Sequence, residues 1–129
     1  MKRAVLPSAV AASLALAASV VQAQDAENGA EVFKRCRACH EVGDTAKNKV
    51  GPILNGIIGR KAGTIEGFNY SDANKKAGAD GWVWTEEKMM AYLLNPRTAM
   101  PGNKMAYAGL KDERDRKDLI AYLKKFSKN

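Results

Sequence analysis

Cys36-Arg37-Ala38-Cys39-His40 is the stretch that decides the fold. Two cysteines separated by two residues, with a histidine directly after the second, form the pattern at which a c-type haem is attached. On one turn of helix the two thiols can reach the two vinyl groups of one porphyrin and form thioethers. His40 then points an imidazole nitrogen at the iron. The motif therefore predicts one covalent haem c, with His40 as its first axial ligand.

Three other uses of these residues are a short-span disulfide, a zinc site and a thioredoxin-type redox pair. Zinc takes four ligands, whereas the whole sequence holds two cysteines and one histidine, all of them inside the motif. A thioredoxin-type pair belongs to a βαβ pattern, and no such pattern follows here. These counts favour haem attachment.

The first 23 residues have the features of a secretory signal peptide. Met1-Lys2-Arg3 is basic, residues 4–21 are uncharged, and Val21-Gln22-Ala23 places small residues before a cleavage point. A retained membrane anchor is the alternative, because an uncharged run of about 20 residues can span a bilayer. The alanine-rich composition and the proline and serines within the run argue against an anchor.

Cleavage after Ala23 is therefore expected, with an exported mature domain of residues 24–129. Its first residue, Gln24, can cyclise to pyroglutamate. The mature chain has 106 of the 129 residues and a formal charge of +5, because the leader removes two basic residues and no acidic one from the total of +7. So small a core is marginal by itself, and a buried porphyrin would supply apolar contacts. Because the chain is expected to be exported, its net positive charge favours an acidic protein partner over nucleic acid.

Helix signals occur at four places along the mature chain. The helix of residues 26–37 follows an N-cap at Asp25, a short one follows Ser71 and runs through Lys76, one follows Thr85 and stops at Asn95-Pro96, and the last follows Asp112. In the last helix, apolar residues recur at helical spacing: Leu119, Tyr122, Leu123 and Phe126. The glycine-rich region of residues 43–67 is too irregular for helix. The fold class predicted is all-α, with three main helices, short helices and long loops wrapped around one haem.

The second axial position has no histidine left to fill it, because His40 is the only histidine in the chain. Methionine, lysine, a weaker ligand or water remain. Met89 and Met90 have the apolar spacing of core residues in a helix. Met100 and Met105 flank a Pro-Gly turn that could fold across the far face of the haem. Spacing alone does not choose between these two.

Over nearly all of the mature part, the chain resembles the class I cytochromes c, above all the bacterial cytochrome c2 group, which is akin to mitochondrial cytochrome c. The segments that carry the resemblance are the Gly29-to-Phe33 segment, CRACH, KVGPILNGIIGRKAG, GFNYSDANK, WTEE, YLLNP, PGNKM and AGLKDERDRKDLIAYLKK. The resemblance implies that Met105 is the second iron ligand and that Met100 fills an apolar loop position. It also implies that Gly29 and Phe33 pack against Leu119 and Tyr122.

Supporting roles follow from the same resemblance. The Pro52 carbonyl is expected to accept a hydrogen bond from His40, which would fix the orientation of the ring. The groups expected to contact the haem propionates are Arg60, Tyr70 and Trp84. The groups expected in a polar network beneath Met105 are Asn74 and Tyr92. Without the resemblance, core packing with a satisfied polar tip would be the simpler interpretation of the three aromatic residues.

The chain departs from the family pattern at three positions. An additional tryptophan, Trp82, lies in a slightly longer segment before Trp84. Tyr107 stands where phenylalanine is common, and Thr98 stands where many relatives have a docking lysine. None of these positions belongs to the expected ligand set.

The resemblance implies a soluble, monomeric one-electron carrier of the periplasm and not an enzyme. A haem enzyme such as a peroxidase would need an open sixth position, which Met105 would close. The expected donor is a bc1-type complex, and the expected acceptor is a photosynthetic reaction centre or a terminal oxidase. Basic residues around the haem edge would dock acidic faces of these partners: Arg35, Lys47, Lys49, Arg97, Lys104 and Lys111. Simple solvated surface charge is the alternative for such residues.

Overall fold

The computed structural model describes residues 1–7, 9–13, 15 and 24–127 of the chain. The expected cleavage point after Ala23 lies outside the described residues. Among the residues that are described, the regular structure is helical, with one isolated bridge between Lys61 and Val83 in place of any strand. None of the described helices has the length and apolar character needed to cross a membrane. The predicted all-α fold is confirmed.

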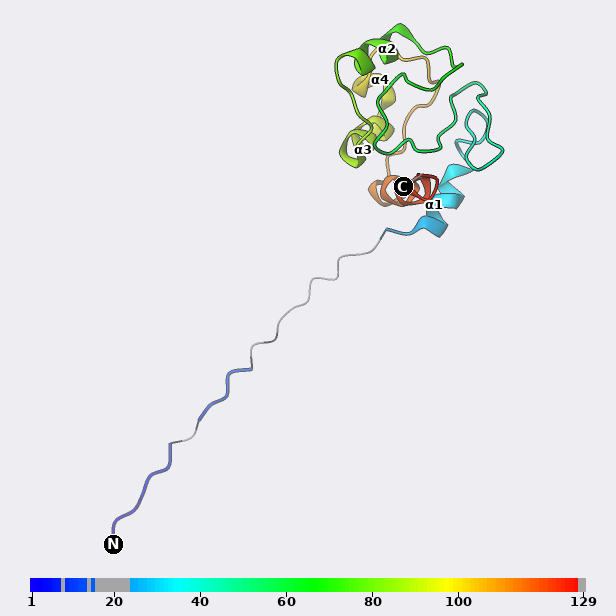
Figure 1. Cartoon of the computed structure of the whole chain (residues 1–129). Coiled ribbons are helices and arrows are strands. Elements are labelled where there is room, and N and C mark those ends of the chain that lie inside the picture. The colour runs from blue at the N-terminus through cyan, green and yellow to red at the C-terminus, as the bar shows by residue number, and fades with distance from the viewer. Residues whose placement is uncertain (8, 14, 16–23, 128–129) are drawn as a thin grey trace.

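In the described part of the chain, five helices follow one another (Figure 1): α1 (Ala26–Phe33), α2 (Asp72–Ala79), α3 (Glu86–Leu94), α4 (Pro96–Ala99) and α5 (Glu113–Lys124). Four of them begin where the sequence predicts an N-cap. The capping side chains accept hydrogen bonds from backbone N–H groups of the first turn, and they belong to Asp25, Ser71, Thr85 and Asp112. Such caps satisfy N–H groups that have no partner within the helix.

The helices differ from the sequence prediction in three respects. α1 ends at Phe33, four residues before the expected end, because the chain then changes to tight turns. Cys36 N–H donates to the Phe33 carbonyl at 2.8 Å, and Cys39 N–H donates to the Cys36 carbonyl at 3.1 Å. These i to i+3 bonds are typical of a tightened helix end, and they place the cysteines on turns.

The other two differences lie near α2 and α4. α2 continues to Ala79 instead of stopping at Lys76, and its Gly78 lies directly against the Ala62 carbonyl. α4 was not expected. It begins with Pro96 at a first-turn position, and the Asn95 side chain accepts from the Thr98 N–H at 3.2 Å. Proline suits the first turn because its missing N–H is not needed there.

α1 and α5 cross at one end of the molecule (Figure 1). At the crossing point, a Cβ placed on Gly29 would lie 2.0 Å from the Asp118 carbonyl oxygen, so only glycine lets the helices approach this closely. The Phe33 and Tyr122 rings pack with centroids 5.4 Å apart. The Asp118 side chain is buried and accepts from the Asp25 N–H at 2.8 Å. The crossing therefore joins the two ends of the described domain, as the resemblance implied.

The remaining chain forms long loops that lie beside α2, α3 and α4 (Figure 1), and α3 also packs against α5. The buried core runs through both regions, from Phe33, Leu119 and Leu123 to Ile57, Trp84, Met89 and Leu93. Most of these core residues face a common cavity.

The crossing gives a first prediction. Replacing Gly29 by alanine should lower the free energy of unfolding by about 2 kcal/mol or more, because the added methyl forces α1 away from α5. Denaturant unfolding of the holoprotein measures the change. Glu31→Ala, at an exposed position of the same helix, should change it by less than about 0.5 kcal/mol. Equal stability of the Gly29→Ala and wild-type proteins would contradict the close approach.

Candidate functional site

A cavity of about 350 Å³ lies between the helices and the loops. Its wall includes every residue that the sequence analysis assigned to haem binding or iron ligation: Cys36, Cys39, His40, Pro52, Arg60, Tyr70, Asn74, Trp84, Tyr92 and Met105. Apolar side chains fill much of the remaining wall, among them Phe33, Leu54, Ile57, Leu93, Leu119 and Leu123. Residues from all parts of the domain therefore meet at one largely apolar site.

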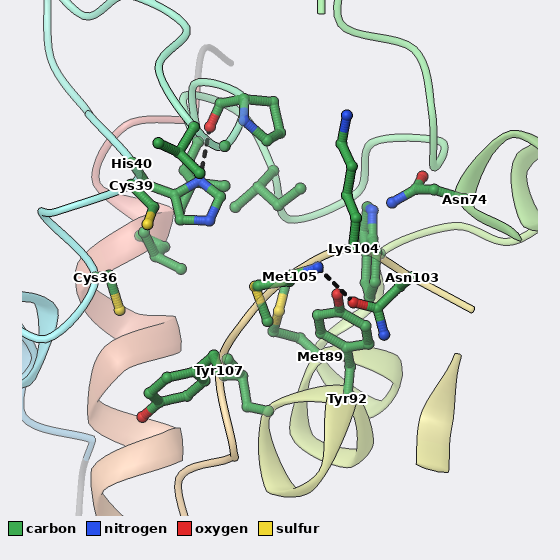
Figure 2. A pocket seen from close by; sticks show the side chains of 18 of the residues that line it. Cys36, Cys39, His40, Asn74, Met89, Tyr92, Asn103, Lys104, Met105 and Tyr107 are labelled. Atoms are coloured by element: carbon green, nitrogen blue, oxygen red, sulfur yellow. Dashed lines mark hydrogen bonds between the residues drawn. The ribbon is translucent and has the colours of Figure 1, made fainter. Parts of the chain in front are cut away.

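The two cysteines are free and half-buried on the same side of the cavity (Figure 2). Burial raises the pKa of the Cys36 thiol, and the neighbouring Cys39 acts in the same direction against the opposing effect of Arg35. The Cys36 sulfur is therefore held as a neutral thiol at ordinary pH. Two accessible thiols on one wall are suited to addition to the two vinyl groups of one ring.

The His40 ring is fixed by its contact with Pro52. Its Nδ1 atom lies 2.7 Å from the Pro52 carbonyl oxygen (Figure 2). A carbonyl can only accept, so Nδ1 carries the proton and Nε2 keeps its lone pair for a metal. Burial lowers the pKa of His40, with Arg60 contributing in the same direction, and so favours this neutral form.

Gly51 packs against the face of the same ring. A Cβ on Gly51 would lie 2.3 Å from Cε1 of His40, which is closer than any side-chain carbon can approach. The glycine and the following proline carbonyl therefore hold the imidazole from two directions. Its orientation does not depend on a bound group.

The methionines divide between core and cavity. Met100 is 4% exposed and lies in the core, away from the cavity wall. Met105 is partly exposed, lines the cavity and lies across from His40 in the close-up view (Figure 2). Met89 also reaches the cavity, but it is 6% exposed and belongs to the packed face of α3. The loop position gives Met105 the freer thioether.

Arg60 and Asn74 bring polar groups to the cavity wall. The Arg60 guanidinium donates to the carbonyls of Asn55 at 3.0 Å and Ile53 at 3.2 Å, and burial lowers its pKa. No carboxylate of the described residues lies within ion-pair distance of it. The Asn74 Oδ1 atom is buried without a hydrogen-bond partner. A buried acceptor without a donor is costly, so the Asn74 oxygen fits a wall completed by a hydrogen-bond donor. The positively charged Arg60 guanidinium, in contrast, fits a wall completed by an acidic group.

The aromatic residues of the cavity interlock. Trp84 packs edge-on against Tyr92, with ring centroids 4.8 Å apart. Tyr70 is buried and its hydroxyl accepts from the Ile65 N–H at 3.0 Å. The additional Trp82 is not part of the cavity wall; it packs edge-on against the outer side of Trp84 at 5.4 Å, under the Lys88 ammonium.

The six residues expected to dock partners are all exposed. Only Arg35 and Lys104 line the cavity, and both have internal partners. Arg35 lies 3.8 Å from the Asp115 carboxylate. The Lys104 ammonium donates to the Asn69 carbonyl and lies over the Phe68 ring. Lys49 donates to the Arg37 carbonyl at 3.0 Å, which places its charge beside the cysteine motif.

Sequence reasoning missed Asn103, whose side chain lines the cavity and contacts the chain around Met105. The available signal was an amide residue directly after Pro101-Gly102. It indicates a turn, but it does not show which backbone groups the amide reaches.

The donors of this site fit haem c. Paired thiols, a metal-ready imidazole and an opposing thioether surround an apolar cavity whose polar edge carries an unpaired arginine. Haem c uses the paired thiols and the imidazole together, whereas a disulfide or a thiol redox pair would use the thiols alone.

Comparison with known proteins points the same way. Residues 26–127 match the family model described as cytochrome c. Cytochrome c2 of Blastochloris viridis is 56% identical over 114 residues, which cover 87% of each chain. Cytochrome c-550 of Ancylobacter novellus is 62% identical over 99 residues, covering 77% of this chain and 92% of that protein. The solved structure of cytochrome c2 from Rhodospirillum centenum superposes with a TM-score of 0.75 at 47% identity, covering 81% of this chain and 99% of that one.

The buried phenol of Tyr92 gives a pH-dependent prediction. Burial raises its pKa from 10.0 to about 12, so the folded state favours the protonated form. This contribution is complete below pH 10 and is lost as the pH rises from 10 to 12, by at most about 3 kcal/mol. Tyr92→Phe should therefore lose less stability than the wild type over that range, as measured by denaturant unfolding at each pH. Identical pH slopes for the two proteins would show that the phenol does not contribute.

Proposed function

The chain belongs to the cytochrome c family, and from this premise we propose that it carries single electrons in the periplasm with His40 and Met105 as the axial ligands of its haem iron. Family membership itself makes the chain a c-type cytochrome with covalent haem c, an electron carrier rather than an enzyme. The ligands, the compartment and the partners are the proposed part.

The observation that carries the proposal is the arrangement of the cavity wall. His40 has its Nε2 lone pair available on one wall, and the Met105 thioether lies on the opposite wall. Cys36 and Cys39 lie beside His40, so a group attached to them is held between the two ligands. Bound haem c supplies an iron that exchanges one electron between Fe(II) and Fe(III).

The residues of the chain determine how that electron is held. His40 cannot rotate, because Gly51 and the Pro52 carbonyl fix its ring. A neutral thioether opposite a histidine favours the reduced state and raises the reduction potential. The apolar side chains around the cavity exclude water, and Met105 occupies the position that an open-site enzyme would leave to a substrate.

The compartment and the partners follow from the sequence. The N-terminal segment has the features of a cleaved leader, which supports export to the periplasm. Of the basic residues named above, Arg35 and Lys49 lie beside the cysteine motif and would steer acidic partners toward that side of the cavity. A bc1-type complex as donor and a reaction centre or terminal oxidase as acceptor fit this scheme.

Three methionine variants test the ligand. In Met105→Leu, the weak far-red absorption band of methionine bound to ferric iron should vanish and the reduction potential should fall, because the thioether is lost. Met89→Leu and Met100→Leu, which keep side-chain volume at the two buried positions, should retain the band. Loss of the band in one of these two instead would assign the ligand to that residue and refute the role of Met105.

A charge reversal beside the cysteine motif tests docking. Lys49→Glu should lower the rate constant for reaction with an acidic redox partner about 3- to 10-fold at low ionic strength, because it weakens steering. Added salt should shrink the difference, since the Debye length falls to about 8 Å at physiological ionic strength.

The matched control is Lys117→Glu, which makes the same charge change on α5. Lys117 is exposed there and pairs with Glu113 at 2.6 Å, on the side away from the cavity-lining Leu119 and Leu123. Its rate should stay within about twofold of the wild type at each ionic strength, because steering acts locally. If both variants lower the rate constant equally, the cause is the net charge of the protein, and the proposed docking surface is refuted.

A further inference from the structure

We propose that Asn103 is a positioning residue for Met105, and that its side chain holds the ligand loop, defined as residues 100–110, in the conformation that closes the cavity. The inference rests on the proposed function, because it takes Met105 as the second axial ligand. It assigns a role to a residue that the sequence analysis left without one.

The Asn103 side chain connects the end of α4 with the backbone of Met105. Its Nδ2 group donates to the Pro96 carbonyl at 2.9 Å and to the Met100 carbonyl at 2.8 Å. Its Oδ1 atom accepts from the Met105 N–H at 2.9 Å (Figure 2). A single side chain therefore fixes the backbone from which the thioether projects.

The rest of the ligand loop has little other support from its backbone. Residues 104–109 are all described, and no backbone-to-backbone hydrogen bond joins any of them to another residue. The next such bond runs from the Leu110 N–H to the Leu93 carbonyl at 2.7 Å. The Lys104 contact with the Asn69 carbonyl holds the loop from its other side, but through a long and exposed side chain. Asn103 is thus the anchor nearest the ligand.

The hydrogen bonds also exclude a direct role as a donor to a bound group. An amide side chain has two N–H donors, and both of those of Asn103 point to backbone carbonyls. Although the residue lines the cavity, its donors are occupied. Asn103 therefore acts through Met105.

This anchoring matters because a thioether is a neutral, weak ligand. It remains on the iron only while the loop is closed, so an external ligand binds in proportion to the fraction of molecules whose loop is open. The energy of the Asn103 contacts sets that fraction. Weakening them should raise the apparent affinity for an external ligand without altering the iron site itself.

Imidazole binding to the ferric holoprotein measures the open fraction. In Asn103→Ala, loss of the far-red band should occur at about tenfold lower imidazole concentration, which corresponds to about 1.4 kcal/mol less closure energy. Asn103→Asp keeps an oxygen that can accept from the Met105 N–H but lacks the two donors, so its affinity should lie between those of the wild type and Asn103→Ala.

The control variant is Asn28→Ala at the crossing of α1 and α5. The Asn28 amide also donates two hydrogen bonds, to Asp118 at 2.8 Å and Asp115 at 3.2 Å, but it lies outside the cavity wall. Asn28→Ala should lower global stability and leave the imidazole affinity unchanged. Amide hydrogen exchange provides a second measurement: the Met105 N–H should exchange about tenfold faster in Asn103→Ala, while that of Leu110 should not change.

The outcomes separate this inference from the proposed function. Absence of the far-red band in the wild-type ferric protein refutes ligation by Met105. If the band is present but Asn103→Ala binds imidazole with wild-type affinity, the positioning role is wrong. If Asn28→Ala tightens imidazole binding as much as Asn103→Ala does, the effect reflects global stability and the positioning role is again wrong.

Discussion

The hydrogen bond from the His40 ring to the Pro52 carbonyl is the contact on which the rest of the site depends. It leaves Nε2 as the free nitrogen, and the close packing of Gly51 prevents the ring from turning. The cysteine motif directly precedes this histidine, so the ring orientation is fixed beside the point of haem attachment. Every other side chain of the cavity is placed relative to this one fixed imidazole.

Around that contact, some parts of the protein are tightly packed and others are held by few hydrogen bonds. The crossing of α1 and α5 and the packed aromatic residues Trp84 and Tyr92 form a stiff frame. The ligand loop, in contrast, is held mainly by side chains. The histidine side of the cavity is therefore rigid, and the methionine side is held more lightly. Redox exchange needs neither ligand to move.

Much of the fold could be predicted because helix starts are local events. The caps Asp25, Ser71, Thr85 and Asp112 lie within three residues of the N–H groups that they satisfy, so the sequence displays them directly. The early end of α1 could not be predicted, because the cysteine motif allows both helix and tight turns. The contacts of Asn103 could not be predicted for another reason: they depend on where the Pro96 carbonyl lies in three dimensions. Spacing could not choose between Met100 and Met105, whereas the resemblance favoured Met105; the burial of Met100 away from the cavity is consistent with that choice.

The contact between Asp25 and Asp118 joins residues that lie 93 positions apart. Contacts between residues so far apart in sequence slow folding, because a long loop must be closed before the ends can meet. A chain emerging N-terminus first cannot make this contact until its last helix has appeared. The α1 and α5 crossing thus postpones completion of the fold until α5 has been synthesised.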